Sequence, residues 1–202
     1  MTQPTEPIEF AVAADEITER FTAGSTFSPA VLEDLHKICT TSTEAQSLAE
    51  HGRDWWPLAM HWAINGKTPR KPGAVSTPKT TEQVAALVAA CNKHDLPLTV
   101  AGGRSGVCGS AVPLYGGVVL DVTAMQGIVS VDQVSGIVEV LPGTFGPDFE
   151  NELQSKYSLT VGHFPQSFDI STVGGWVACR GDGHCVRALG QSKGWTDGWR
   201  RE

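Results

Sequence analysis

The sequence predicts a mixed α+β fold, and two observations carry that prediction. A strand–helix–strand unit occupies residues 74–100, and three β-rich runs follow it within residues 117–141. Helical patterns lie before and after these segments. With 202 residues, of which 41% are hydrophobic, the chain is long enough to bury one core or two small lobes.

The amino-terminal part is expected to be helical. Residues 12–21 are compatible with a first helix, although no packing partner for it can be named. Ser28 followed by Pro29 is typical of an N-cap with proline at the first helical position, and it predicts a helix over residues 29–39. Residues 43–51 are expected to form another helix.

The strand–helix–strand unit is strongly marked. Ala74–Ser76 reads as a short strand, and Thr80 with Gln83 forms a capping box that opens a helix. The apolar positions of this helix are Val84, Leu87, Val88 and Cys91. A second strand is predicted at Leu98–Val100.

This second strand leads into a glycine-rich loop that ends at Pro113. Glycines at positions 102, 103, 106 and 109 lack a Cβ, so a ligand can approach the main chain, and successive amides can form a concave nest for phosphate. The spacing matches neither Gly-x-Gly-x-x-Gly nor Gly-x-x-x-x-Gly-Lys-Ser/Thr, and Ser105 is not in a nucleophile elbow. We predict an anion-binding loop, with a glycine-rich surface turn as the alternative.

The hydrophobic period then changes to two. Residues 117–122, 127–132 and 136–141 are three β-rich runs separated by turn residues, and we expect three antiparallel strands in a meander. A helix is predicted at Pro147–Lys156, with Phe149 and Leu153 on one face.

A second glycine-bearing stretch covers residues 161–181. Ser171 and Thr172 can cap a turn that begins at Val173, and Gly174 and Gly175 permit the close approach of a flat or charged ligand. Two separate glycine loops suit a long ligand that is held at several points.

Composition excludes several classes of protein. The net charge of −7 disfavours a general nucleic-acid binder. Five cysteines, an odd number without framework spacing, indicate a reducing compartment. The amino-terminal residues and the short apolar runs predict neither a secretory signal nor a membrane-spanning segment. We therefore expect a cytoplasmic protein. His184, Cys185 and Cys179 fit no common metal site, so no metal is predicted.

Three motifs, at residues 97–113, 117–144 and 165–181, resemble the flavin-binding domain of the vanillyl-alcohol oxidase / p-cresol methylhydroxylase (PCMH-type) family. The likeness is greatest to alkyldihydroxyacetonephosphate synthases and to FAD-linked D-lactate and glycolate oxidases. It implies a two-lobed α+β FAD-binding domain, incomplete at the carboxyl terminus. The cofactor contacts that the resemblance implies are Val100, Ala101, Gly102, Gly103, Arg104, Ser105, Gly106, Val107, Gln166, Ser167, Ser171, Thr172, Val173, Gly174, Gly175, Trp176, Ala178 and Arg180.

The resemblance also implies how the cofactor is held. Arg104 stands where covalent relatives often carry histidine, so FAD is expected to bind non-covalently. The segment Gln166–Thr172 differs from the family pattern at Gln166, which is often acidic in relatives. In relatives a cap domain supplies most substrate contacts, and the catalytic residues lie in that domain or beyond it, so none can be assigned here.

The implied organisation has three parts. Residues 1–65 form an amino-terminal helical region, residues 66–181 form a partial FAD-binding domain, and residues 182–202 depart from the family pattern and are expected to be disordered. The expected function is that of an FAD-linked oxidoreductase of small 2-hydroxy acids or of an alkyl-glycerone-phosphate synthase. The alternative is a non-catalytic, truncated or frameshifted remnant that binds FAD weakly or not at all.

Overall fold

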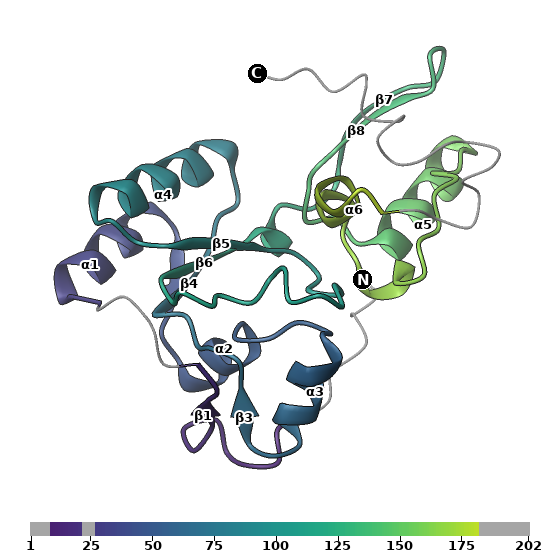
Figure 1. Cartoon of the computed structure of the whole chain (residues 1–202). Coiled ribbons are helices and arrows are strands. Elements are labelled where there is room, and N and C mark those ends of the chain that lie inside the picture. The colour runs from purple at the N-terminus through teal and green to yellow at the C-terminus, as the bar shows by residue number, and fades with distance from the viewer. Residues whose placement is uncertain (1–8, 22–26, 182–202) are drawn as a thin grey trace. The chain divides into compact units, whose positions relative to one another are not determined.

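The computed structural model describes residues 9–21 and 27–181, which fall into two compact units (Figure 1). Residues 9–124 form the amino-terminal unit, and residues 125–181 form the carboxyl-terminal unit. The expectations for residues 182–202 lie outside the described residues.

A four-stranded sheet with the order β2-β4-β6-β5 forms the centre of the amino-terminal unit (Figure 1). The strands β4 (Ala74–Thr77), β6 (Val118–Asp121) and β5 (Leu98–Ala101) run parallel, whereas β2 (Thr40–Ser42) is antiparallel to β4. The prediction of a meander that includes residues 117–122 was therefore wrong. Val118, Val119 and Leu120 are all buried, and a run that is apolar on both faces belongs in the middle of a parallel sheet.

Helices cover both faces of this sheet. α1 (Pro29–Ile38) and α4 (Thr81–Lys93) pack on one face, where their apolar residues surround Ala74, Val118 and Leu120. α2 (Ala45–Glu50) places Leu48 against Val75, Ala101 and Val119, which are the core residues of the opposite face. α3 (Pro57–Ala63) follows α2 along the chain.

The predicted helix starts are confirmed at α1 and α4. The Ser28 hydroxyl accepts a hydrogen bond from the Val31 amide at 3.4 Å, and the Thr80 hydroxyl accepts one from the Gln83 amide at 3.3 Å. The Gln83 side chain reaches back to the amide of Lys79 at 2.7 Å, one residue before the cap. Both helices therefore have an orphan amide satisfied by the residue that the sequence indicates.

The expected helix over residues 12–21 is absent from the described residues 9–21. Instead β1 (Thr18–Glu19) pairs in parallel with β3 (Lys67–Thr68). The Glu19 carboxylate fixes this pairing, because it accepts from Arg70 Nη1 at 2.8 Å and from the Lys71 amide at 2.7 Å.

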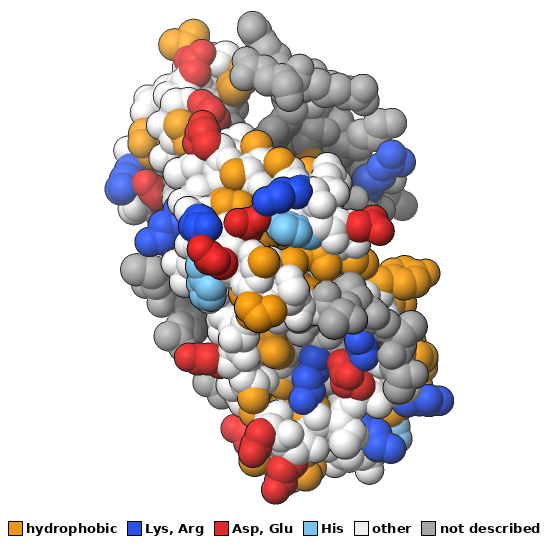
Figure 2. Space-filling view, turned by 90° about the vertical axis from the view of Figure 1, so that its left-hand side faces the viewer, with side chains coloured by type: hydrophobic (Ala, Val, Ile, Leu, Met, Phe, Trp, Pro, Cys, Tyr) orange, Lys and Arg blue, Asp and Glu red, His pale blue; other side chains and the backbone are white. Residues whose placement is uncertain are grey.

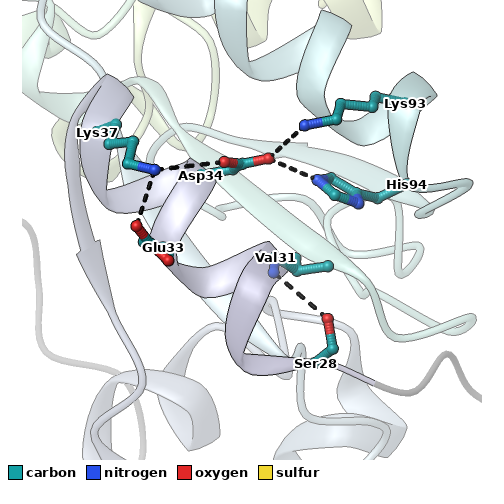
Figure 3. A network of polar contacts seen from close by, with 7 residues as sticks. All are labelled: Ser28, Val31, Glu33, Asp34, Lys37, Lys93 and His94. Carbon is teal, nitrogen blue, oxygen red and sulfur yellow. Dashed lines mark hydrogen bonds and ion pairs between the residues drawn. The ribbon is translucent and has the colours of Figure 1, made fainter.

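A polar network joins α1 to the end of α4 (Figure 3). Asp34 accepts from Lys93 Nζ at 2.6 Å and contacts His94 Nε2 at 2.9 Å, and Lys37 lies 3.8 Å from its other oxygen. The side of the molecule that carries α1 and α4 shows acidic, basic and histidine side chains interspersed with apolar ones (Figure 2).

The carboxyl-terminal unit consists of a hairpin and two main helices. β7 (Ile128–Asp132) and β8 (Ile137–Val140) are antiparallel, as predicted, and α5 (Gly146–Tyr157) matches its predicted range closely. Together with α6 (Val173–Cys179), these elements bury a core made of Val140, Phe149, Leu153, Val173 and Trp176.

Two short 3₁₀ turns complete the described elements, at Val122–Ala124 and Phe168–Ile170. Glu150 on α5 is 6% exposed, and its carboxylate accepts hydrogen bonds from Gln154, Thr160 and the Val161 amide at 2.6, 2.7 and 2.8 Å. It thereby fixes the start of the stretch that carries the second set of predicted site residues.

Candidate functional site

The glycine loop begins at the carboxyl end of β5, the strand at one edge of the parallel sheet. Arg104 has a left-handed φ of +53°, an uncommon conformation for a residue with a side chain, and Gly109 has a φ of +78°. Within the described part of the chain, the amides of Gly103, Arg104 and Gly106 donate no hydrogen bond. These N–H groups can therefore donate hydrogen bonds to a ligand. Such a set of main-chain donors suits an anion such as a diphosphate.

A segment between α2 and α3 supports the loop, and we call residues 50–56 the loop floor. Arg104 Nη1 donates to the carbonyl oxygen of Glu50, and the Trp55 amide donates to the Arg104 carbonyl at 3.3 Å. The strained residue of the loop is thus held by its side chain and by its main chain. Gly109 lies against the ring of Trp56, because an added Cβ would be 3.3 Å from that ring.

Buried charges concentrate in the loop floor. Arg53 is 2% exposed, and its guanidinium lies 3.1 Å from a Glu50 oxygen and 4.3 Å above the ring of Phe10. Asp54 is 3% exposed; its Oδ1 accepts from the Trp56 amide at 3.0 Å. Asp54 Oδ2 has no hydrogen-bond partner in the described residues.

The end of β6 adds a histidine–aspartate pair. His51 Nε2 lies 3.0 Å from Asp121 Oδ2, His51 Nδ1 lies 2.9 Å from the Ser47 carbonyl, and the Thr123 amide donates to Asp121 Oδ1 at 2.9 Å. Burial raises the pKa of Asp121, but the hydrogen bonds from His51 and Thr123 outweigh it and lower the pKa overall.

Burial also lowers the pKa of the Arg104 guanidinium, and the carboxylates of Asp121, Glu50 and Asp54 oppose that change. Arginine has such a high intrinsic pKa that Arg104 stays charged. The loop therefore carries one cation, the Arg104 guanidinium, and this group is already hydrogen-bonded to Glu50 of the loop floor.

The residues predicted for the glycine loop fall into three groups by exposure. Ala101 is buried in the sheet, whereas Val100 and Val107 are exposed by 58% and 60%. Gly102, Gly103, Arg104, Ser105 and Gly106 are partly exposed. Main-chain groups are thus the accessible polar groups of residues 102–106, together with the Ser105 side chain.

The second predicted set, residues 166–180, lies in the carboxyl-terminal unit, and several of its side chains are internal. Trp176 stacks on Phe168 with ring centroids 5.8 Å apart, contacts His163 edge to face at 5.2 Å, and donates its indole N–H to Ser171 Oγ at 2.6 Å. Val173 is 6% exposed and belongs to the same core.

The capping prediction for Ser171 and Thr172 was wrong in its side-chain detail. Thr172 is the N-cap residue of α6, but its hydroxyl makes no capping hydrogen bond and, 1% exposed, has no partner in the described residues. The Ser171 hydroxyl is used by Trp176 instead. The competition between a local cap and a buried indole donor cannot be seen in the sequence.

The two glycines at the start of α6 have different surroundings. A Cβ at Gly174 would lie 2.8 Å from the Pro142 carbonyl oxygen, so the chain itself occupies that space. At Gly175 an added Cβ would meet only the Thr172 hydroxyl at 3.5 Å, an ordinary contact. Gly175, rather than Gly174, therefore has the room for a ligand. Other accessible side chains of this set are Gln166, Ser167, Ala178 and Arg180.

Sequence reasoning missed the loop floor. In this stretch Trp55 and Trp56 indicate an aromatic packing cluster, because clustered aromatic side chains usually bury area. Nothing in it indicates that the charged residues Arg53 and Asp54 are buried beneath the glycine loop. Only long-range contacts with Arg104 and Gly106 reveal its place beneath the loop.

Comparison with known proteins identifies the class to which this fold and loop belong. The FAD binding domain family matches residues 72–200, and the chain belongs to that family. Among curated relatives, an alkyldihydroxyacetonephosphate synthase from Trypanosoma brucei brucei is 30% identical over 136 residues, which are 65% of this chain and 21% of that protein. A D-lactate dehydrogenase from Anaerostipes hadrus is 33% identical over 121 residues, 60% of this chain and 25% of that protein.

Solved structures show the same fold. An alkyldihydroxyacetonephosphate synthase superimposes with a TM-score of 0.81 at 22% identity, covering 93% of this chain and 35% of that one. A p-cresol methylhydroxylase gives a TM-score of 0.66 at 22% identity, covering 79% of this chain and 31% of that one. The chain spans about a fifth to a third of the length of these proteins. The predicted PCMH-type fold and family are thereby confirmed.

The described residues include neither a membrane-spanning helix nor a cluster of metal ligands. No helix there is long and apolar enough to cross a membrane. No cluster of three or more histidine, cysteine or acidic side chains in residues 9–21 and 27–181 could hold a metal ion.

Proposed function

We propose that residues 66–181 bind FAD non-covalently, as the cofactor-binding part of an enzyme that oxidises small 2-hydroxy acids or acts as an alkyl-glycerone-phosphate synthase. The observation that carries this proposal is that the amides of Gly103, Arg104 and Gly106, directly after a parallel strand, donate to no other described residue. Family membership supports FAD as the ligand. The names of the relatives support the two substrate classes.

In this proposal the diphosphate is held by amides within residues 101–107, namely those of Gly103, Arg104 and Gly106. The loop offers main-chain donors rather than free cations, because the Arg104 guanidinium is already bonded to the Glu50 carbonyl. In the carboxyl-terminal unit, the accessible positions around Gly175, together with Gln166 and Arg180, are proposed to contact the flavin.

The proposed division of labour is simple. Bound FAD would supply the electron-pair chemistry, which belongs to the cofactor in flavoenzymes. The residues of this chain bind and orient it, and none of them is assigned a proton-transfer role. Non-covalent attachment is supported by residues 101–107, which include no histidine, cysteine or tyrosine.

A flavin titration of the full 202-residue chain tests the proposal. We expect quenching of FAD fluorescence with a saturable isotherm. Gly103→Asp should weaken binding by at least about tenfold, a loss of about 1.4 kcal/mol, because it adds bulk and a like charge next to the diphosphate.

Val134→Asp is the matched control, because Val134 is 99% exposed in the β7–β8 hairpin and the substitution adds the same charge. It should bind FAD as the unmodified chain does. Equal affinity in Gly103→Asp and the unmodified chain would contradict the loop assignment. No saturable binding at all would favour the alternative of a non-catalytic remnant.

A further inference from the structure

The carboxylate of Asp54 is buried directly beneath the glycine loop. Its Oδ1 is fixed by the Trp56 amide at 3.0 Å, while Oδ2 has no hydrogen-bond partner in the described residues. Oδ2 faces the loop, because a Cβ built on Gly106 would lie 3.7 Å from it and 3.1 Å from the Ser110 hydroxyl. Gly106 carries one of the amides that no residue of the described part of the chain uses.

No cation pairs with this carboxylate among the described residues. Arg53 is engaged by Glu50 and Phe10, and Arg104 donates to the Glu50 carbonyl. The other charged or titratable groups of the cluster are Asp121 and its partner His51. Burial raises the pKa of Asp54, and the nearby amides of Trp56, Ala111, Asp54 and Gly109 only partly oppose the rise.

An anion bound to the loop amides would lie close to a second negative charge, the Asp54 carboxylate, with only the main chain of Gly106 between them. In a site shielded from water, such repulsion is strong, and a carboxyl group relieves it by taking up a proton. We propose that Asp54 takes up a proton from solvent when an anion binds the glycine loop, so that binding of the FAD diphosphate is coupled to protonation of this carboxyl group. The inference rests on the proposed FAD site.

The direction of the coupling follows from linkage. If binding favours neutral Asp54, then protonation of Asp54 favours binding by the same factor. The affinity for FAD therefore begins to fall as the pH rises past the pKa of Asp54 in the free protein. It stops falling once the pH exceeds the higher pKa of Asp54 in the complex. A single proton limits the slope to about tenfold per pH unit.

Asp54→Asn tests the coupling because asparagine copies the protonated carboxyl group in size and charge. FAD affinity of the full chain is measured from pH 5.5 to 8.5 by fluorescence titration, with calorimetry in two buffers of different ionisation enthalpy. We expect the unmodified chain to lose affinity with rising pH and to take up a proton on binding. The Asp54→Asn chain should bind FAD with one affinity across the range, equal to the low-pH affinity of the unmodified chain, and take up none.

Two control variants separate this coupling from other effects. Asp95→Asn removes the same charge at an exposed, left-handed position of the same unit, where asparagine is well tolerated, and it should keep the pH dependence. His51→Gln removes the other titratable partner of the cluster and should keep it too.

Weaker FAD binding by Asp54→Asn at every pH would mean that the charged carboxylate of Asp54 positions the loop amides for the ligand. That result would overturn the inference. So would a pH dependence that survives in Asp54→Asn or disappears in His51→Gln. Absence of FAD binding in all variants at all pH values would overturn the proposed cofactor site itself. Binding without proton uptake would overturn the coupling alone.

Discussion

The Gly174 amide donates to the Pro142 carbonyl oxygen at 2.8 Å, and a Cβ at position 174 would lie equally close to that oxygen. Gly174→Ala should therefore destabilise the carboxyl-terminal unit by about 1–3 kcal/mol, because a buried methyl group would push main chain against main chain. Urea denaturation followed by tryptophan fluorescence measures the loss.

The neighbouring glycine provides the control. Gly175 has room for a Cβ and lies within α6, so Gly175→Ala should be neutral or stabilise the fold by up to about 1 kcal/mol. If Gly175→Ala nevertheless weakens FAD binding, that supports a ligand contact at this position. A stable Gly174→Ala chain would show that the α6 start can shift away from Pro142.

Glu150→Ala should destabilise the chain by about 1–3 kcal/mol. The substitution leaves the partly buried Val161 amide without its acceptor, which costs up to that amount, whereas the exposed Thr160 hydroxyl can turn to water. Glu152→Ala on the same helix removes only a surface pair with Lys156, so it should change stability by less than about 0.5 kcal/mol. Equal losses in the two variants, measured from urea midpoints, would contradict this role for Glu150.

The link between α1 and α4 should weaken in acid. Hydrogen bonds from Lys93 and His94 lower the pKa of Asp34 from 3.8 to about 2 (Figure 3). Because the pKa is depressed in the folded state, the contribution of Asp34 to stability is complete above pH 3.8 and is lost as the pH falls towards 2. Asp34→Asn should lower the urea midpoint at pH 7, and the difference from the unmodified chain should vanish near pH 2.

Glu33→Gln is the comparison for this prediction. Glu33 is exposed, and among residues 9–21 and 27–181 its one ion pair is with Lys37 of its own helix at 2.9 Å, so its loss should leave the midpoint nearly unchanged. A pH-independent difference for Asp34→Asn would mean that its contribution is not electrostatic.

Acid precipitation should release all bound flavin into the supernatant. Arg104 offers no side chain for attachment, and the nearest candidate, the exposed free thiol of Cys108, lies outside residues 101–107. Cys108→Ser should therefore bind and release FAD like the unmodified chain. Flavin fluorescence that stays with the denatured polypeptide would contradict non-covalent binding.

The sequence predicted those elements that local chemistry determines. The Ser28 and Thr80 caps, the β7–β8 hairpin and α5 all follow from turn residues and from hydrophobic period within a short window. The glycine loop could also be located, because its residue types stand directly after a strand.

What could not be predicted depends on partners far along the chain. A two-residue period cannot tell whether Val118–Asp121 pairs with the next strand or enters an existing parallel sheet. Residues 12–21 carry a weak helical pattern that the pairing of Thr18 with Lys67 overrides. The loop floor, with Asp54 beneath Gly106, exists only once residues fifty positions apart have come together.

The position of β6 determines when the amino-terminal unit can fold. β4 and β5 are both synthesised before β6, yet neither is hydrogen-bonded to the other, because β6 lies between them. During translation the two earlier strands must therefore wait, with their inner edges unpaired, until Val118–Asp121 has left the ribosome. Long-range parallel pairing of this kind is slow and leaves strand edges open to aggregation.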